Sequence, residues 1–140
     1  MSEQTISASQ FEERLAALCL GGAGTAFPRR TRDRHILYRS IIHGLDHARK
    51  YSETELNDAL QQWRLDIGTC LDIDHVTLRR YLIDERYISR DANGNAYQVN
   101  PAGNAAIEFE PSIAAIDPFM VIQAAKDRVA ERKRQQALRA

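Results

Sequence analysis

The sequence predicts a mainly α-helical fold with a small antiparallel β-hairpin, forming a winged-helix-like core with additional N-terminal and C-terminal helices. Three observations carry this prediction. Apolar residues recur at helical spacing in three consecutive segments between Thr31 and Asp84. A short segment of strand-forming residues follows, and it contains Asn93-Gly94, a dipeptide typical of tight hairpin turns. The order helix, short extended stretch, helix, helix, hairpin is that of a winged-helix domain.

Length and composition limit the alternatives. A chain of 140 residues has room for one core with peripheral helices. The 19 basic and 19 acidic side chains give a net charge of zero, so nucleic-acid binding would have to depend on local charge. The basic residues concentrate in Arg29 to Arg34 and near the C-terminus. No apolar run approaches the roughly 18 residues that a membrane span needs, so we expect no membrane association and a cytoplasmic location.

Three regions are expected: residues 1–26 as an N-terminal helix and flexible linker, 27–100 as the winged-helix-like domain, and 101–140 as a connector and C-terminal helix. In the first region, Ser9 and Glu12 have the spacing of a capping box. In the last, Asp117-Pro118 predicts a helix start, with Asp as the N-cap and Pro at the first helical position. The narrow apolar stripe of this last helix requires a partner, either the N-terminal helix or a second subunit.

Within the core, the expected helices run from about Thr31 to Leu45, from Glu53 to Arg64, and from a cap at Asp72 or Asp74 onward. Ser52 with Glu55 repeats the capping-box spacing before the second helix. Leu78, Tyr81 and Leu82 form the inward stripe of the third helix. Alternating apolar residues between Leu65 and Ile73 predict extended chain, with a small hairpin as one form of it.

The second hairpin has a definite predicted register. If Asn93 and Gly94 form the turn, both with positive φ, then Ile88 lies opposite Val99 and Arg90 lies opposite Tyr97. The first pair is apolar and the second is a cation-π pair, and both stabilise this register.

Several motifs resemble a known family. The stretches FPRRTRDRHILYRSI, KYSETELNDAL, HVTLRRYLIDERYISRD and GNAYQV occur in this order between Phe27 and about Val99. They are similar to a small bacterial domain of unknown function that has FP followed by basic residues, Y-[ST]-E-x-E-[VL]-N, T-L-R-R-x-L-[IV]-D and a closing R-D-x-x-G-x-Y. The resemblance implies a winged-helix-like fold and a regulatory association, because the domain occurs alone or at the C-terminus of ArsR-type transcriptional regulators. It implies no reaction, and the flanking helices lie outside it.

The candidate nucleic-acid-binding residues fall into three groups. Arginine can bind guanine through two hydrogen bonds and asparagine or threonine can contact phosphate, which are the contacts that double-stranded DNA would require. The same arginines of the third helix fit ion pairs with Asp84, Glu85 or Glu55 instead, and acidic neighbours would repel phosphate. The groups are the basic segment with Arg29, Arg30, Arg32 and Arg34, the third helix with His75, Thr77, Arg79 and Arg80, and the hairpin tip with Asn93 and Asn95.

Other classes of function receive less support. The leading hypothesis is a non-enzymatic regulator that binds DNA or associates with transcription, either alone or as a homodimer through its terminal helices. The alternative is an adaptor that binds a protein partner through the same scaffold. His43 and His47 have the spacing of H-E-x-x-H, but Gly44 occupies the position of its catalytic Glu, so we expect no metal and no cofactor. Cys19 and Cys70 have no C-x-x-C partner and are expected to be free, partly buried thiols.

Overall fold

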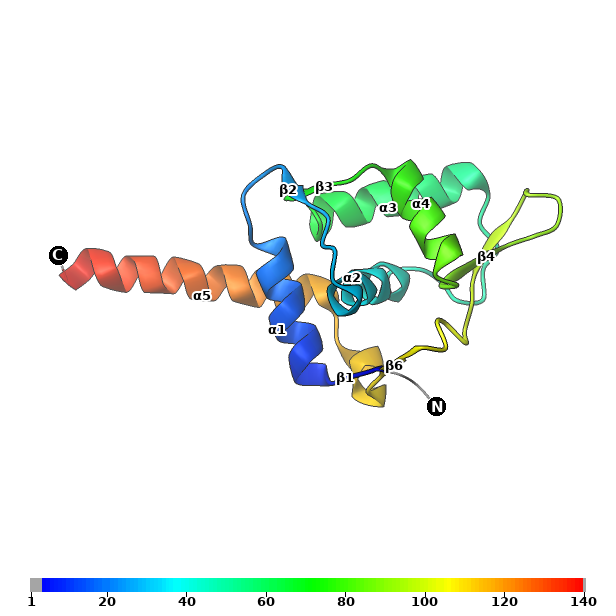
Figure 1. The fold of residues 1–140 in the computed structure, drawn as a ribbon. Coiled ribbons are helices and arrows are strands. Elements are labelled where there is room, and N and C mark those ends of the chain that lie inside the picture. The colour runs from blue at the N-terminus through cyan, green and yellow to red at the C-terminus, as the bar shows by residue number, and fades with distance from the viewer. Residues whose placement is uncertain (1–3, 140) are drawn as a thin grey trace.

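A computed structural model describes residues 4–139, and helices account for most of this range (Figure 1). The predicted mainly helical fold with a small antiparallel hairpin is confirmed at this level, and two further strand pairs are present. The α-helices are α1 (Ala8–Cys19), α2 (Thr31–His43), α3 (Glu53–Asp66), α4 (His75–Asp84) and α5 (Pro118–Arg139), with a short 3-10 helix, η1 (Pro111–Ala115). The strands are β1 (Gln4–Ile6), β2 (Thr25–Ala26), β3 (Leu71–Asp72), β4 (Ile88–Arg90), β5 (Tyr97–Val99) and β6 (Ile107–Phe109).

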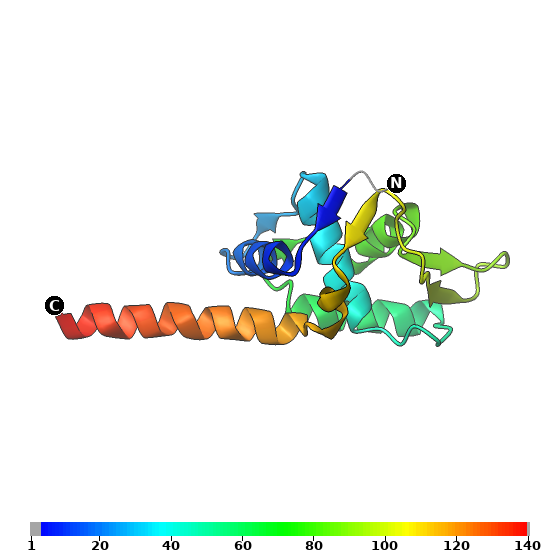
Figure 2. The same ribbon diagram turned by 90° about the horizontal axis from the view of Figure 1, so that it is seen from below.

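The core forms around α2, which lies between α1 on one side and the α3–α4 pair on the other (Figures 1 and 2). Most of α2 is buried from Asp33 to Ile42, because helices cover it from more than one direction. The predicted inward residues of the next two helices lie in the core: Leu56, Leu60 and Trp63 from α3 and Leu78 and Leu82 from α4 are buried, while Tyr81 is half-buried. The Trp63 indole donates a hydrogen bond to Ser40 Oγ at 3.0 Å, which satisfies the buried N–H.

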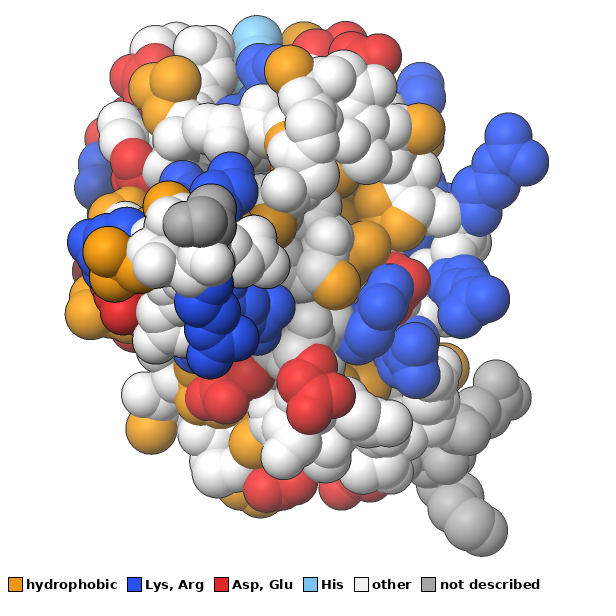
Figure 3. Space-filling model, turned by 90° about the vertical axis from the view of Figure 1, so that its left-hand side faces the viewer, with side chains coloured by type: hydrophobic (Ala, Val, Ile, Leu, Met, Phe, Trp, Pro, Cys, Tyr) orange, Lys and Arg blue, Asp and Glu red, His pale blue; other side chains and the backbone are white. Residues whose placement is uncertain are grey.

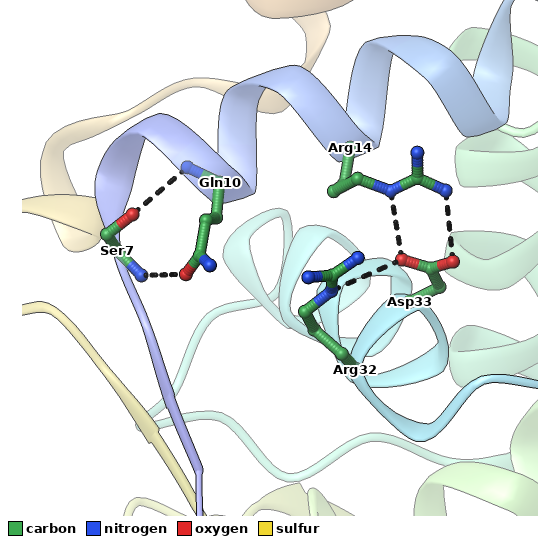
Figure 4. A network of polar contacts seen from close by, with 5 residues as sticks. All are labelled: Ser7, Gln10, Arg14, Arg32 and Asp33. Carbon is green, nitrogen blue, oxygen red and sulfur yellow. Dashed lines mark hydrogen bonds and ion pairs between the residues drawn. The ribbon is translucent and has the colours of Figure 1, made fainter.

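Side-chain caps begin four of the described helices, α1, α3, α4 and α5. The predicted capping box of Ser52 and Glu55 at α3 is confirmed, and Asp74 is the N-cap of α4. The box predicted from Ser9 and Glu12 is wrong, because the pair that caps α1 is Ser7 and Gln10 (Figure 4). Glutamine at the third helical position can complete a capping box as Glu does, so the same signal occurred two residues earlier in the chain.

The β4–β5 hairpin has the predicted register. Ile88 pairs with Val99 and Arg90 with Tyr97, and the Arg90 guanidinium lies 5.7 Å from the centre of the Tyr97 ring. The predicted two-residue turn is wrong, since Gly94 has positive φ but Asn93 does not. Residues 92–95 instead form a longer loop, in which Gly94 N donates to Asp91 O and Asn95 N donates to the Asp91 carboxylate. Tyr51 pairs with the far side of Tyr97 through an antiparallel bridge.

Two parallel strand pairs join segments that are distant in sequence. β1 pairs with β6, and β2 pairs with β3. The stretch from Leu65 to Ile73, predicted to be extended or a hairpin, is neither throughout: α3 continues to Asp66, and only β3 is a strand, with β2 as its partner. Neither pairing has a local sequence signal, because two- and three-residue strands are too short for a period to appear.

The predicted start of the last helix is confirmed, as Asp117 Oδ1 accepts a hydrogen bond from Phe119 N. The first half of α5 packs on α1 and buries Ile122 and Ala125. All described residues after Ala125 are exposed, and this outer half of α5 projects away from the rest of the molecule (Figures 1 and 2). Of the two partners expected for this helix, α1 covers its inner half. Within residues 4–139, no helix is long and apolar enough to cross a membrane.

Candidate nucleic-acid interface

Arg79 of the third predicted helix is a packing residue. Its Nη1 donates to Asn57 Oδ1 at 2.6 Å, and its Nη2 lies 3.0 Å from Glu53 Oε1. The side chain is only 16% exposed, and its guanidinium also lies 5.9 Å from the Tyr97 ring centre. Arg79 therefore joins α4 to α3 and to the hairpin. The ion pair expected as the alternative to DNA contact exists, but its partner is Glu53 rather than Asp84, Glu85 or Glu55.

Arg80, the next residue, is exposed on the outer side of α4. It borders a groove between α4 and the hairpin, called the α4–hairpin groove below, which has a volume of about 340 Å³. Apolar side chains form part of this groove, and Val76 is 51% exposed there. Its lining consists of Glu53, Val76, Arg79, Arg80, Ile83, Asp84, Arg90 and Tyr97. The groove thus combines two exposed arginines, Arg80 and Arg90, with two carboxylates.

The first turn of α4 holds His75 and Thr77 beside a charged cap. Thr77 N donates to Asp74 Oδ1 at 2.7 Å, and this hydrogen bond lowers the pKa of the Asp74 carboxyl. Asp74 therefore stays ionised at the end of the helix that a phosphate would approach. His75 Nδ1 lies 3.5 Å from Gln61 Nε2, at the limit of a hydrogen bond. Both candidate residues are half-buried.

The basic segment divides into inward and outward arginines. Arg34 lies between two aromatic rings, 4.5 Å from the Tyr81 centre and 5.4 Å from that of Phe27. Arg32 Nε lies 3.7 Å from the carboxylate of Asp33. Both arginines hold the start of α2 in place. Arg29 and Arg30 are exposed, and in the described part of the chain neither forms an ion pair.

The carboxylate near Arg32 is itself a structural link. Asp33 is 3% exposed and accepts two hydrogen bonds from Arg14 of α1, at 3.1 and 3.0 Å. Figure 4 shows Arg14 and Arg32 approaching it from different directions. The two-bond geometry is the strong form of an Arg–carboxylate pair. The acidic residue within the basic segment therefore joins α1 to the start of α2.

The hairpin tip is the third predicted group. Asn93 and Asn95 are exposed, and the loop that bears them extends from the body at the end opposite the outer half of α5 (Figure 1). Gly94 is favoured there, because its φ of +71° is a backbone conformation that other residues rarely adopt. The structure thus brings Arg80, Arg90 and the α4–hairpin groove to one side, and leaves Arg34 and Arg79 as internal supports.

A buried polar cluster behind α4 was not anticipated from sequence. His35 Nδ1 lies 2.6 Å from Tyr87 Oη, and His35 Nε2 lies 3.5 Å from Glu85 Oε2. The direction of the hydrogen bond between His35 and Tyr87 depends on which ring nitrogen carries the proton. Burial lowers the pKa of His35 and raises that of Tyr87. His35 follows the basic segment directly, but no motif in the sequence links it to Tyr87.

Surface charge is uneven. Figure 3 views the molecule along α5 and shows many Lys and Arg side chains around the projecting helix and at the right-hand edge, with acidic side chains below them and along the upper edge. The outer half of α5, residues 126–139, has six basic and two acidic side chains, a net charge of +4. The rest of the chain therefore has a net charge of −4.

The histidine and cysteine residues do not form a site. α2 ends at His43, so His43 and His47 do not lie on one helix, and His47 Nε2 lies 2.9 Å from Ile42 O. In residues 4–139 no group of three or more His, Cys, Asp or Glu side chains could hold a metal ion. Cys19 and Cys70 are free and buried, and burial raises the pKa of Cys19 to about 12.

Comparison with known proteins identifies the family. Residues 25–99 match the model of a family described as an uncharacterized protein conserved in bacteria (DUF2087). This range is more than half of the chain, and the protein belongs to that family. No curated protein matches the sequence, and no solved structure matches it. The matched range begins at β2 and ends with β5, so it contains α4, the basic segment and the hairpin.

Proposed function

We propose that residues 27–100 form a winged-helix domain that acts, without catalysis, as a DNA-binding or transcription-associated regulator. The observation that carries the proposal is the exposed side of α4, with Arg80 beside a projecting hairpin that bears Arg90, Asn93 and Asn95. The bridge between Tyr51 and Tyr97 supports it too, because a short strand between the first two core helices is part of the winged-helix pattern. So does the resemblance to the domain associated with ArsR-type regulators.

In this proposal α4 enters the major groove and the hairpin approaches the backbone. Arg80 is the candidate for base contact, while Arg29 and Arg30 add phosphate contacts. His75, Thr77, Asn93 and Asn95 remain candidates at the two ends of the same face. Arg32, Arg34 and Arg79 support the interface without contacting DNA, because their guanidinium groups lie against a carboxylate or an aromatic ring of the protein.

Fluorescence anisotropy with a labelled duplex tests the proposal. We expect binding at low salt that weakens steeply at moderate salt, because phosphate contacts release counterions. Arg80→Ala should weaken binding about tenfold, the loss of about 1.4 kcal/mol expected for one specific arginine contact. Arg128→Ala, on α5, is the matched control and should bind as the unaltered protein does. Absence of binding at low salt would exclude the DNA hypothesis.

A second candidate function is a protein-interaction adaptor. The specific observation is the α4–hairpin groove, where exposed Val76 and half-buried Ile83 lie between Glu53 and Asp84. An apolar floor with carboxylates at its edge suits a peptide with apolar and basic side chains. Stoichiometric recovery of one protein from the cell, lost in Val76→Asp but kept in Arg128→Ala, would favour this function over DNA binding.

A homodimer is proposed for the outer half of α5. Leu138 and Val129 are 86% and 39% exposed there, and a second copy has the complementary net negative charge on its body. Light scattering at rising salt measures the mass directly. We expect a dimer that dissociates in Leu138→Glu, and a monomer at all concentrations would contradict it.

A further inference from the structure

A cavity lies between α2, the loop that follows β5, and β6. Its volume is about 470 Å³, which is in the range of small-molecule sites, about 300 to 1,000 Å³. Ile42, Val99, Ile107 and Phe109 give it apolar walls. It is separate from the α4–hairpin groove, with which it shares no lining residue.

Arg39 of α2 is the cation in this cavity. Its guanidinium lies 6.0 Å from the Phe109 ring centre, and the residue is half-buried. Burial lowers the pKa of Arg39, which means that its environment disfavours the charge. Among residues 4–139 no carboxylate lies within ion-pair distance of Arg39, and no hydrogen bond of its side chain is found. Arg14 and Arg79, which are also half-buried, both have carboxylate partners.

The other polar side chains of the cavity already have partners within the protein. Asn100 Nδ2 donates to Arg86 O, and Asn104 Nδ2 donates to Glu85 O. His47 Nε2 is held by Ile42 O. Glu108 also lines the cavity and has a contact of its own. Arg39 is therefore the group with unused hydrogen-bonding capacity, since a guanidinium has five N–H donors.

We propose that this cavity binds a small organic anion, a carboxylate with an apolar body, and that Arg39 is its anchor. A guanidinium binds a carboxylate through two parallel hydrogen bonds, and the Arg39 guanidinium lies near the Phe109 ring at the wall of the cavity. The apolar walls would cover the rest of the ligand. The site does not depend on DNA binding by α4, so either proposal can fail without the other.

Titration of the ¹⁵N-labelled full chain with benzoate tests the site, and benzamide is the matched neutral probe. We expect benzoate to shift the amide signals of Val99, Ala102, Gly103 and Ile107, with benzamide at least tenfold weaker. Equal binding of the two probes, or shifts confined to α5 and other basic surfaces, would overturn the proposal.

Two variants of Arg39 test whether this residue binds the carboxylate of the ligand. Arg39→Gln should weaken benzoate binding at least tenfold, while Arg39→Lys, which keeps the charge, should lose less. Arg80→Gln removes an exposed arginine outside the cavity and should leave the affinity unchanged. Unchanged affinity in Arg39→Gln would refute the assignment. If Arg39→Gln does not fold, the comparison of benzoate with benzamide on the unaltered protein still decides whether the site selects a carboxylate.

Discussion

The two faces of α4 differ although their residues alternate within ten positions of sequence. The inner face buries Leu78 and Leu82 completely, and Arg79 at its edge is held by Asn57 and Glu53. The outer face exposes Val76, Arg80 and Asp84. Two adjacent arginines thus have different roles, which the helical rotation of about 100° per residue determines.

Within one basic motif, the arginines on the buried side of the helix and those on its exposed side therefore have different roles. The basic segment repeats the lesson, because Arg32 and Arg34 point to Asp33 and Tyr81 whereas Arg29 and Arg30 face solvent. In both places the arginines on the inner side lie against an aromatic ring or a carboxylate of the protein. A substitution on either face should therefore separate stability from binding.

The largest effect is expected from the inner face. Leu82→Ala removes a fully buried side chain and leaves a cavity, and we expect the free energy of unfolding to fall by about 3 kcal/mol. Chemical denaturation measures this loss. Val76→Ala, on the outer face of the same helix, is the control and should change stability by less than about 0.5 kcal/mol. Similar losses in both variants would remove the distinction between the faces.

Arg79→Ala tests whether the edge of the inner face is structural. It breaks a hydrogen bond to Asn57 and an ion pair with Glu53, and we expect a loss of about 1 to 2 kcal/mol. The expected loss of stability is no larger because the Glu53 side chain is 61% exposed, so water can hydrate its carboxylate when the arginine is removed. Denaturant midpoints of Arg79→Ala and Arg79→Lys give the measurement. If Arg79→Ala leaves the stability unchanged, Arg79 is again a candidate for direct DNA contact.

The buried cluster behind α4 predicts a pH dependence. The pKa of His35 is lowered mainly by burial, and Glu85 opposes this only in part. Below pH about 6.5 the unfolded chain binds a proton that the folded state resists, so stability should fall as the pH falls from 6.5 toward the folded-state pKa. The slope for one such group cannot exceed about 1.4 kcal/mol per pH unit. His43 contributes in the same direction, since burial lowers its pKa too.

Denaturation at several pH values between 5 and 8 checks this dependence. His35→Gln retains a group that can hydrogen-bond to Tyr87 and should flatten the curve. His75→Gln is the control, because His75 lies on α4 away from the cluster. A curve that His35→Gln leaves unchanged would assign the dependence to other groups.

The smallest effect on stability should come from Arg80→Ala. The side chain is exposed, so we expect a change within about 0.5 kcal/mol, measured by thermal unfolding. Together with a loss of DNA affinity, this result would place the function on the outer face. A large loss of stability would instead make Arg80 a packing residue like Arg79.

Much of the fold follows from local signals. Helical periodicity and the caps Ser52, Asp74 and Asp117 locate α3, α4 and α5 correctly, and residue pairing predicts the register of β4 and β5. These features depend on neighbours in sequence. The turn at Asn93 could not be resolved, because the Asp91 carboxylate stabilises a longer loop that the dipeptide signal does not encode.

The parts that sequence could not predict are long-range. The pairings of β1 with β6 and of β2 with β3, and the contact between His35 and Tyr87, each depend on where separate elements meet. The prediction of the candidate site also lacked this long-range information. Composition and spacing marked ten residues, but only packing shows that Arg32, Arg34 and Arg79 already have partners.

The β1–β6 pairing has a consequence for how the chain folds. Gln4 pairs with Ile107, so β1 can pair only with residues that lie about a hundred positions later in the chain. Contacts this distant in sequence are slow to form, and on a ribosome they cannot form until the later segment has emerged. We expect the segment from α2 to β5 to acquire structure first, with the first strand added only after synthesis has passed Phe109.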